Sequence, residues 1–357
     1  TIGRRQRQMC IRDRLKVKEI VKETNDTVSV SFQVPEDLKE AYAFTPGQYL
    51  TLKLTINNEE QRRSYSICSS STEDITVAVK RVENGLVSSY LNEVLKENDE
   101  MEVMTPEGNF TLETDQAKKR KFVGFAAGSG ITPIMSMIKE LSMDETETVF
   151  TLFYSNKMES DVIFKHQLDQ LAGDNLKINY IYTRQKLNNP LLEGRIDKSK
   201  ATELIKADLS CLNADAFYLC GPEEMIFNVK SALEEFGVLN TKIKFELFTT
   251  PVLMAEKPKQ QEADENFDGE ALVTVIYDDE EIDFNLNKDG DTILDAAMDN
   301  DVDVPFSCKG AVCCTCKAKV TEGKVTMDAN YALSDQEVED GYVLACQSHP
   351  ALSLIHI

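Results

Sequence analysis

Short runs of alternating apolar and polar residues occupy the first 110 positions of the chain. Six of these runs are rich in β-branched residues and are separated by Asn, Asp, Pro and Gly: 15–21, 27–34, 48–54, 63–68, 75–82 and 100–104. Alternation of this kind is typical of β-strands, and the intervening residue types are typical of turns. Six strands at this spacing predict a closed, six-stranded antiparallel β-barrel over residues 15–112.

The pattern changes in the middle of the chain. Continuous apolar runs alternate with stretches of helical periodicity, and the runs cover residues 121–127, 148–154, 177–182 and 216–220. Buried strands alternating with helices are typical of βαβ units. We therefore expect residues 118–250 to form an α/β domain with a parallel sheet.

The last third of the chain contains a polar connection and then a new set of β-rich runs. Residues 251–268 hold two prolines and many charged side chains, which indicates a linker. Residues 269–351 begin with two β-rich runs separated by acidic turn residues and predict a small α+β domain. The expected fold is thus multidomain: β, then α/β, then α+β.

The two ends of the sequence differ from the domains that they flank. Residues 1–14 carry five Arg without apolar periodicity, and residues 352–357 form a short apolar segment after the expected domain end. QMCIRDR and LSLIHI are similar to translated sequencing-adapter read-through. We interpret both ends as non-native; the alternative for residues 1–14 is a basic arm that binds a partner.

Composition and charge exclude several classes of function. No apolar run approaches the ~20 residues needed to cross a bilayer, and the formal net charge is −22. This charge opposes general attraction to nucleic acid or anionic lipid. From Pro251 to the end, 7 Lys and Arg stand against 23 Asp and Glu. We expect a cytoplasmic protein with no nucleic-acid or membrane partner and with an acidic C-terminal domain.

Four of the nine cysteines have the spacing of a metal centre. Cys308, Cys313, Cys316 and Cys346 follow the pattern C-x4-C-x2-C-x29-C. Zinc sites usually pair two short C-x2-C hooks, whereas this spacing favours an iron–sulfur cluster. Here the chain resembles the plant-type [2Fe-2S] ferredoxins over residues 269–350, which implies a β-grasp-like domain with these four cysteines as ligands.

Two residues of this loop depart from the ferredoxin pattern. Family members commonly place Gly three residues after the first ligand, where this chain has Ala311. Cys314 lies out of register with the ligands, and we interpret it as a packing residue.

The first domain contains a candidate flavin site. Arg63, Tyr65 and Ser66 form R-x-Y-S, in which the guanidinium suits a diphosphate, the ring suits a flavin and the hydroxyl suits a bond near flavin N5. FTPGQY precedes this motif, and VKRVENGLVSSYL and PEGNF follow it. In this order the motifs resemble the ferredoxin–NADP reductase superfamily. The resemblance implies FAD, with Val79, Lys80 and Val82 beside it and with its phosphate held by Gly85, Leu86, Val87 and Ser88.

Two glycine-containing loops in the second domain predict a nicotinamide dinucleotide site. Gly128 and Gly130 follow an apolar strand and precede a helical run that contains Thr132 and Pro133. Such a turn lets backbone approach a pyrophosphate at a helix N-terminus. Cys220, Gly221 and Pro222 follow another strand, as in the second nicotinamide loop of the superfamily, and the resemblance places Cys220 against the nicotinamide.

The same resemblance leads to expectations about the nucleotide and about the catalytic residues. Arg184, after an apolar run, matches the position where NADPH-using relatives place an Arg, and Lys157 is a second candidate. We therefore expect NADPH, with NADH as the alternative. Glu246 ends the nucleotide domain, where relatives keep an acidic residue near the flavin. Ser66, Cys220 and Glu246 are the candidate catalytic residues.

The order of barrel, nucleotide domain and ferredoxin domain resembles the reductase components of multicomponent oxygenases. It implies an oxidoreductase that passes electrons from NADPH through FAD and the cluster to an oxygenase subunit, which would dock on the acidic domain. The alternatives are a reductase of another oxygenase that uses FMN and NADH, and a redox-sensing iron–sulfur binding protein.

Overall fold

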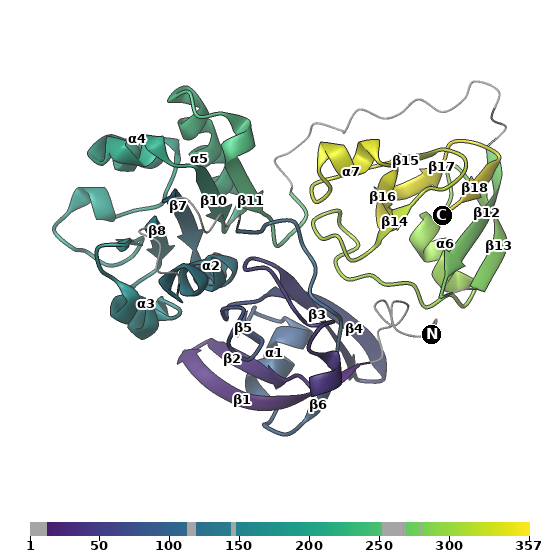
Figure 1. The fold of residues 1–357 in the computed structure, drawn as a ribbon, viewed down its shortest axis with the longest axis horizontal. Helices are drawn as coiled ribbons and strands as arrows, with labels where there is room; N and C mark the ends of the chain where they lie inside the picture. The colour runs from purple at the N-terminus through teal and green to yellow at the C-terminus, as the bar shows by residue number, and fades with distance from the viewer. Residues whose placement is uncertain (1–12, 113–118, 144–147, 252–266, 268, 279) are drawn as a thin grey trace.

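A computed structural model describes residues 13–112, 119–143, 148–251, 267, 269–278 and 280–357 (Figure 1). Most of the expected linker 251–268 and nearly all of the expected non-native segment 1–14 lie outside the described residues. Three bodies are visible, and each corresponds to one of the three patterns in the sequence.

The first body is the expected six-stranded antiparallel barrel. Its strands are β1 (Arg14–Thr24), β2 (Thr27–Gln33), β3 (Tyr49–Ile56), β4 (Glu59–Ser66), β5 (Thr76–Lys80) and β6 (Glu100–Val103). They are hydrogen-bonded in the order β4-β3-β6-β1-β2-β5, and an isolated bridge between Ile67 and Val77 joins the two ends. Alternate residues of these strands point into one apolar core, since a strand directs successive side chains to opposite faces. Helix α1 (Leu86–Glu93) packs against this core.

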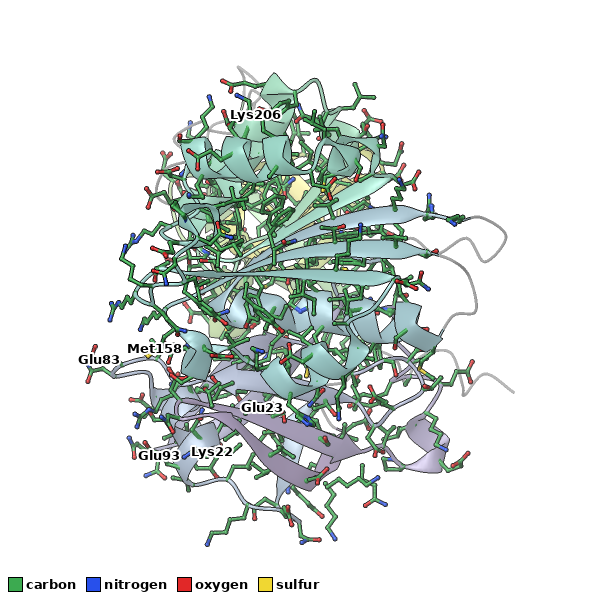
Figure 2. The ribbon with its side chains drawn as sticks, turned by 90° about the vertical axis from the view of Figure 1, so that its left-hand side faces the viewer. Lys22, Glu23, Glu83, Glu93, Met158 and Lys206 are labelled. Atoms are coloured by element: carbon green, nitrogen blue, oxygen red, sulfur yellow. The ribbon has the colours of Figure 1, made fainter. Side chains whose placement is uncertain are left out.

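The second body is a five-stranded parallel sheet between two layers of helices (Figures 1 and 2). Its strands are β7 (Lys121–Ala127), β8 (Val149–Asn156), β9 (Leu176–Tyr182), β10 (Ala216–Cys220) and β11 (Ile243–Glu246), in the order β11-β10-β7-β8-β9. Helices α2 (Ile131–Met143) and α3 (Lys165–Leu171) cover one face, and α4 (Lys198–Ala207) and α5 (Glu223–Glu235) cover the other. Residues of β7 enter the two cores alternately, as the pleat requires.

The third body is a small α+β domain. A sheet in the order β13-β12-β18 combines an antiparallel hairpin, β12 (Glu270–Tyr277) and β13 (Glu280–Asn287), with the parallel strand β18 (Leu354–His356). Two short ladders complete it: β14 (Lys317–Lys319) with β16 (Tyr342–Leu344), and β15 (Val325–Met327) with β17 (Ser348–Pro350). Helix α6 (Ile293–Asp299) packs on the sheet, and α7 (Asp335–Glu339) lies beside β16. The expected fold class is confirmed in all three bodies.

Residues beyond the expected domain end also pair with the third sheet. The sequence places the domain end at residue 351, but Leu354–His356 pair with β12 and the side chain of Ile355 is fully buried. Ile355 packs into the core of the domain while its neighbour Leu354 is exposed, as expected for successive side chains of a strand. The origin of residues 352–357 stays a prediction.

Among the described residues, no helix is both long enough and apolar enough to cross a bilayer.

The third domain contacts the barrel along β3 and β4, where Arg62 bonds to Asp303 and Ser64 bonds to Ser307. The cysteine-rich loop therefore faces the barrel.

Candidate functional site

Two loops meet at the carboxyl ends of neighbouring strands β7 and β10. A Cβ atom on Gly130 would lie 2.1 Å from the carbonyl oxygen of Cys220, so only glycine permits this approach. Gly128 has φ +54, and its carbonyl oxygen accepts a hydrogen bond from the Tyr154 hydroxyl at 3.0 Å. The two loops predicted from sequence are thus brought into contact.

These loops line a cavity of about 600 Å³ that reaches from the sheet to Lys80 of the barrel. Gly128, Gly130, Gly221 and Pro222 are among its lining residues, and α2 begins beside it with Thr132 and Pro133 buried in its first turn. The amide nitrogen of Asn156, a buried lining residue, has no hydrogen-bond partner among the described residues. A glycine turn, a helix N-terminus and an unpaired donor fit a dinucleotide phosphate group.

The cationic residues of this cavity differ in part from those that the sequence suggests. Lys157 and Arg195 line the cavity, whereas Arg184 is exposed and lies outside the lining residues. Arg195 follows a glycine in a loop without periodicity, so the sequence pattern carries no signal for it.

The expected phosphate-binding segment of the barrel has mixed exposure. Gly85 is the N-cap residue of α1, and the Ser88 hydroxyl accepts a bond from the Val82 N–H at 3.1 Å. Val82 and Leu86 are exposed, while Val79 and Val87 are buried in the barrel core. The side chains of these two buried residues are therefore not available to a ligand.

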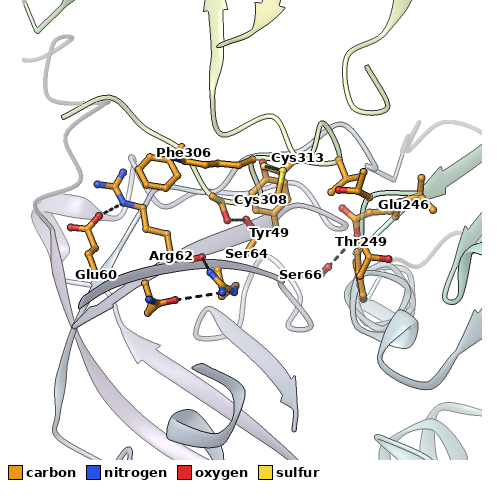
Figure 3. A pocket seen from close by; sticks show the side chains of 18 residues that line it. Tyr49, Glu60, Arg62, Ser64, Ser66, Glu246, Thr249, Phe306, Cys308 and Cys313 are labelled. Carbon is orange, nitrogen blue, oxygen red and sulfur yellow. Dashed lines mark hydrogen bonds and ion pairs between the residues drawn. The ribbon is translucent and has the colours of Figure 1, made fainter. Parts of the chain in front are cut away.

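A second cavity, of about 540 Å³, lies between β4, the segment after β11 and the third domain (Figure 3). Arg63, Ser66 and Glu246 line it, together with Cys308 and Cys313. Tyr65 is not among the lining residues: its ring packs against the barrel core, and burial raises its pKa to about 12. Residues predicted for a flavin therefore share one cavity with two predicted cluster ligands.

The three candidate catalytic residues converge beside this cavity. The Ser66 hydroxyl donates to Glu246 at 3.1 Å, and Cys220 is the register partner of Glu246 across β10 and β11. Burial raises the pKa of Glu246 to about 8, although the bond from Ser66 opposes this shift. Burial, and then the Glu246 carboxylate, raise the pKa of the Cys220 thiol well above its usual value. Glu246 can hold a proton near neutral pH, and Cys220 is a neutral thiol.

The four expected cluster ligands lie in two pairs. The Cys313 thiol donates to Cys308 across 3.0 Å; this bond and the Gly310 N–H lower the pKa of Cys308 to about 6. A bond from Cys316 likewise lowers the pKa of Cys346. Among the described residues, no three or more His, Cys, Asp or Glu side chains are grouped so that they could hold one metal ion. A cluster in which each of two irons takes two thiolates fits this arrangement.

The loop backbone explains the departure from the ferredoxin pattern. Ala311 has φ +63, in the left-handed region that glycine adopts without cost. For Ala this conformation costs roughly 1–2 kcal/mol. The backbone shape is thus kept although the glycine is absent. Cys314 is buried and its thiol donates to the Ala332 carbonyl oxygen at 3.5 Å, as expected of a packing residue.

Three family models match successive parts of the chain. Residues 14–112 match an oxidoreductase FAD-binding domain, residues 125–231 an oxidoreductase NAD-binding domain, and residues 275–351 a 2Fe-2S iron-sulfur cluster binding domain. Together with the two cavities and the paired cysteines, these matches define an NAD(P)H-dependent oxidoreductase that uses FAD and a 2Fe-2S cluster.

Curated relatives match over nearly the whole chain. One subunit of 1,2-phenylacetyl-CoA epoxidase from Escherichia coli (strain K12) is 38% identical over 343 residues, which cover 95% of each chain. The ferredoxin reductase component of 3-ketosteroid-9-alpha-monooxygenase from Rhodococcus rhodochrous is 31% identical over 350 residues, covering 96% of this chain and 95% of the relative. The chain belongs to this family of FAD- and NAD-binding reductases with a C-terminal 2Fe-2S ferredoxin domain.

Solved structures agree on the fold. Phthalate dioxygenase reductase has a TM-score of 0.57 at 23% identity, and the match covers 96% of this chain and 97% of that one. An intact type IV self-sufficient cytochrome P450 monooxygenase has a TM-score of 0.69 at 18% identity, covering 96% of this chain and 40% of that one.

The paired cysteines lead to a first prediction. We expect Cys308→Ala and Cys316→Ala, one from each pair, to lose most of the bound iron, because each variant leaves one iron a thiolate short. Cys314→Ala should retain about two irons per chain. Iron content and visible absorbance of the purified proteins measure this. Equal loss of iron in all three variants would contradict the assignment of ligands.

The raised pKa of Glu246 leads to a prediction on stability. The folded chain keeps this carboxyl protonated up to about pH 8, whereas an unfolded chain releases the proton near 4.5. The free energy of unfolding therefore falls as pH rises through this window. Glu246→Gln cannot ionise, so its melting temperature relative to the wild type should rise from pH 5 to pH 8.5.

Thermal unfolding of the cofactor-free proteins at several pH values checks this expectation. Glu83→Gln, which removes an exposed carboxylate (Figure 2), is the control variant. It measures how the loss of one surface charge changes the melting temperature. A difference between Glu246→Gln and the wild type that does not change with pH would rule out a titrating Glu246.

Proposed function

We propose that this chain is the reductase component of a multicomponent oxygenase and passes electrons from NADPH through FAD and the [2Fe-2S] cluster to a separate oxygenase subunit. One observation carries the proposal: a single cavity is lined by Arg63, Ser66 and Glu246 and also by Cys308 and Cys313, two of the expected cluster ligands. Cofactors held by these two groups of residues would be neighbours. Relatives that are named as reductase components of monooxygenases support the same role.

Each group of residues has a defined task in this proposal. A bound flavin would supply the conversion of a hydride from the nicotinamide into single electrons, and a bound cluster would supply a one-electron carrier for them. The Arg63 guanidinium binds the flavin diphosphate, and the α1 N-terminus at Gly85 receives a phosphate. The turn at Gly128 and Gly130 holds the dinucleotide pyrophosphate. Glu246 holds a proton at its carboxyl, oriented by the Ser66 hydroxyl.

The particular oxygenase is phenylacetyl-CoA epoxidase, a di-iron enzyme of phenylacetate degradation. The 38% identity over 95% of the matching Escherichia coli protein supports this choice. Recognition of phenylacetyl-CoA would belong to the oxygenase subunit. The partner would dock on the acidic third domain in the cytoplasm, and a basic surface on the partner would be complementary to the excess of 23 acidic over 7 basic residues from Pro251 onward.

Reconstitution with purified oxygenase components tests the proposed function. Holoprotein, NADPH and the oxygenase subunits of phenylacetyl-CoA epoxidase, supplied with phenylacetyl-CoA and O2, should yield the epoxide. Turnover should fall several-fold between 50 and 500 mM salt, because salt screens charge-steered docking. Release of FMN on acid denaturation, or turnover only with a different oxygenase, would favour the reductase of another oxygenase. Absence of a reduced-cluster signal would overturn the pathway itself.

Two of the three basic residues that line the nucleotide cavity lie in the second domain, and they predict its specificity. Arg195 and Lys157 line this cavity and Arg184 does not. We expect Arg195→Gln to lower kcat/KM for NADPH about tenfold, because a charge-assisted bond to the 2′-phosphate is lost. The value for NADH should stay within twofold.

Arg184→Gln is the matched control and should change neither value. Steady-state reduction of ferricyanide with each nucleotide measures both. Loss of NADPH preference in Arg184→Gln but not in Arg195→Gln would show that Arg184, and not Arg195, binds the 2′-phosphate.

A further inference from the structure

The third domain is held on the barrel by side chains of both bodies. Arg62 bonds to Asp303 at 2.8 Å, and the Ser64 hydroxyl donates to the Ser307 hydroxyl at 2.8 Å. Asp303 and Ser307 belong to the segment that leads into the cysteine-rich loop, and Phe306 of this segment lies beside Arg62 (Figure 3). These contacts orient the domain as a whole, but they do not touch the backbone between the second and third ligands.

One barrel side chain does reach that backbone. The Tyr49 hydroxyl accepts a hydrogen bond from the Cys314 N–H at 2.9 Å and shares a second bond of 3.2 Å with the Thr315 hydroxyl. Residues 314 and 315 lie between the ligands Cys313 and Cys316. Tyr49 is 5% exposed, so water does not compete for these bonds.

The same side chain belongs to the flavin cavity. Tyr49 is among the lining residues of the 540 Å³ cavity that contains Arg63 and Ser66, and it is the register partner of Ser66 across β3 and β4. Its ring therefore borders one cofactor site while its hydroxyl, at the far end of the ring, bonds to the loop of the other.

The barrel holds Tyr49 in this place. Its backbone exchanges two hydrogen bonds with Glu107, of 2.8 and 3.0 Å. A Cβ atom on Gly108 would lie 3.0 Å from the ring, and Gly108 has φ +118. The chain thus passes close against the ring at a residue whose conformation favours glycine. A side chain fixed in this way transmits the position of the barrel to the loop.

We propose that Tyr49 is a positioning residue for electron transfer between the two cofactors, because its hydroxyl holds residues 314–315 against the wall of the flavin cavity. The inference rests on the proposed function. A bound flavin would accept a hydride from NADPH, so that a C–H bond of the nicotinamide breaks and an N–H bond of the flavin forms. One electron would then pass from the reduced flavin to the oxidised cluster, and this second step forms and breaks no bond. Tyr49 itself exchanges neither electron nor proton.

Rapid mixing of the FAD- and cluster-loaded protein with NADPH under anaerobic conditions tests the role of Tyr49. In Tyr49→Phe the rate of flavin bleaching should stay within twofold of the wild type. Reduction of the cluster, followed by freeze-quench EPR, should be about tenfold slower, since a buried N–H loses the acceptor that the Tyr49 hydroxyl provides. Amide hydrogen exchange in peptides covering residues 309–316 should also be faster.

Tyr42→Phe is the matched control. Its hydroxyl donates to the Val103 carbonyl oxygen at 2.5 Å within the barrel and is equally buried. This variant should leave both rates and the exchange of 309–316 unchanged.

Each other outcome decides against the proposal. An unchanged cluster rate in Tyr49→Phe, equal slowing of both steps, or equal effects of the two variants would overturn it. Loss of iron from Tyr49→Phe would assign the hydroxyl to cluster retention instead. A wild-type protein whose flavin bleaches without any cluster signal would overturn the proposed function, which distinguishes that failure from a failure of Tyr49 alone.

Discussion

One buried positive charge ties the domains together. The side chain of Arg62 is 3% exposed, and its guanidinium bonds to Glu60 at 2.6 Å, to Asp303 at 2.8 Å and to the Val304 carbonyl oxygen at 3.2 Å. It also lies 4.2 Å from the centre of the Phe306 ring. A charge removed from water is tolerated only when it is paired and hydrogen-bonded. Most of these partners belong to the third domain. The Arg62 guanidinium therefore keeps its ion-pair and hydrogen-bond partners only while that domain is packed against the barrel.

The packing of the third domain against the barrel brings the candidate nucleotide, flavin and cluster sites close together. The segment that follows β11 borders all three of them: Phe248 and Thr249 line both cavities, and the Thr250 hydroxyl donates to the Gly310 carbonyl oxygen at 3.1 Å. The strands of a parallel sheet place their carboxyl ends at one edge, where ligands bind in such folds. A nucleotide site, a flavin site and a cluster loop are therefore arranged along one path through the molecule.

Short sequence patterns were sufficient to predict much of this arrangement of sites. The spacing of Cys308, Cys313, Cys316 and Cys346 was sufficient to propose the cluster, because ligand geometry demands a short loop with one distant partner. The loop tolerated Ala311 in place of the expected glycine. Two residues with proposed roles had no sequence signal for those roles: Tyr49 stood in a flavin-type motif without an assigned role, and Arg195 stood in an unpatterned loop.

The amino-acid sequence by itself determined the three domains, their strand and helix types and the spacing of the four candidate cluster ligands, because these follow from the alternation of side chains and from spacing over a few residues. Only the tertiary structure decided which charged residue enters the nucleotide cavity, that β18 extends the third domain to the chain's last residues, and that Tyr49 contacts residues more than 260 positions away. Contacts of this kind depend on how domains pack, and packing joins residues that share no period and no motif.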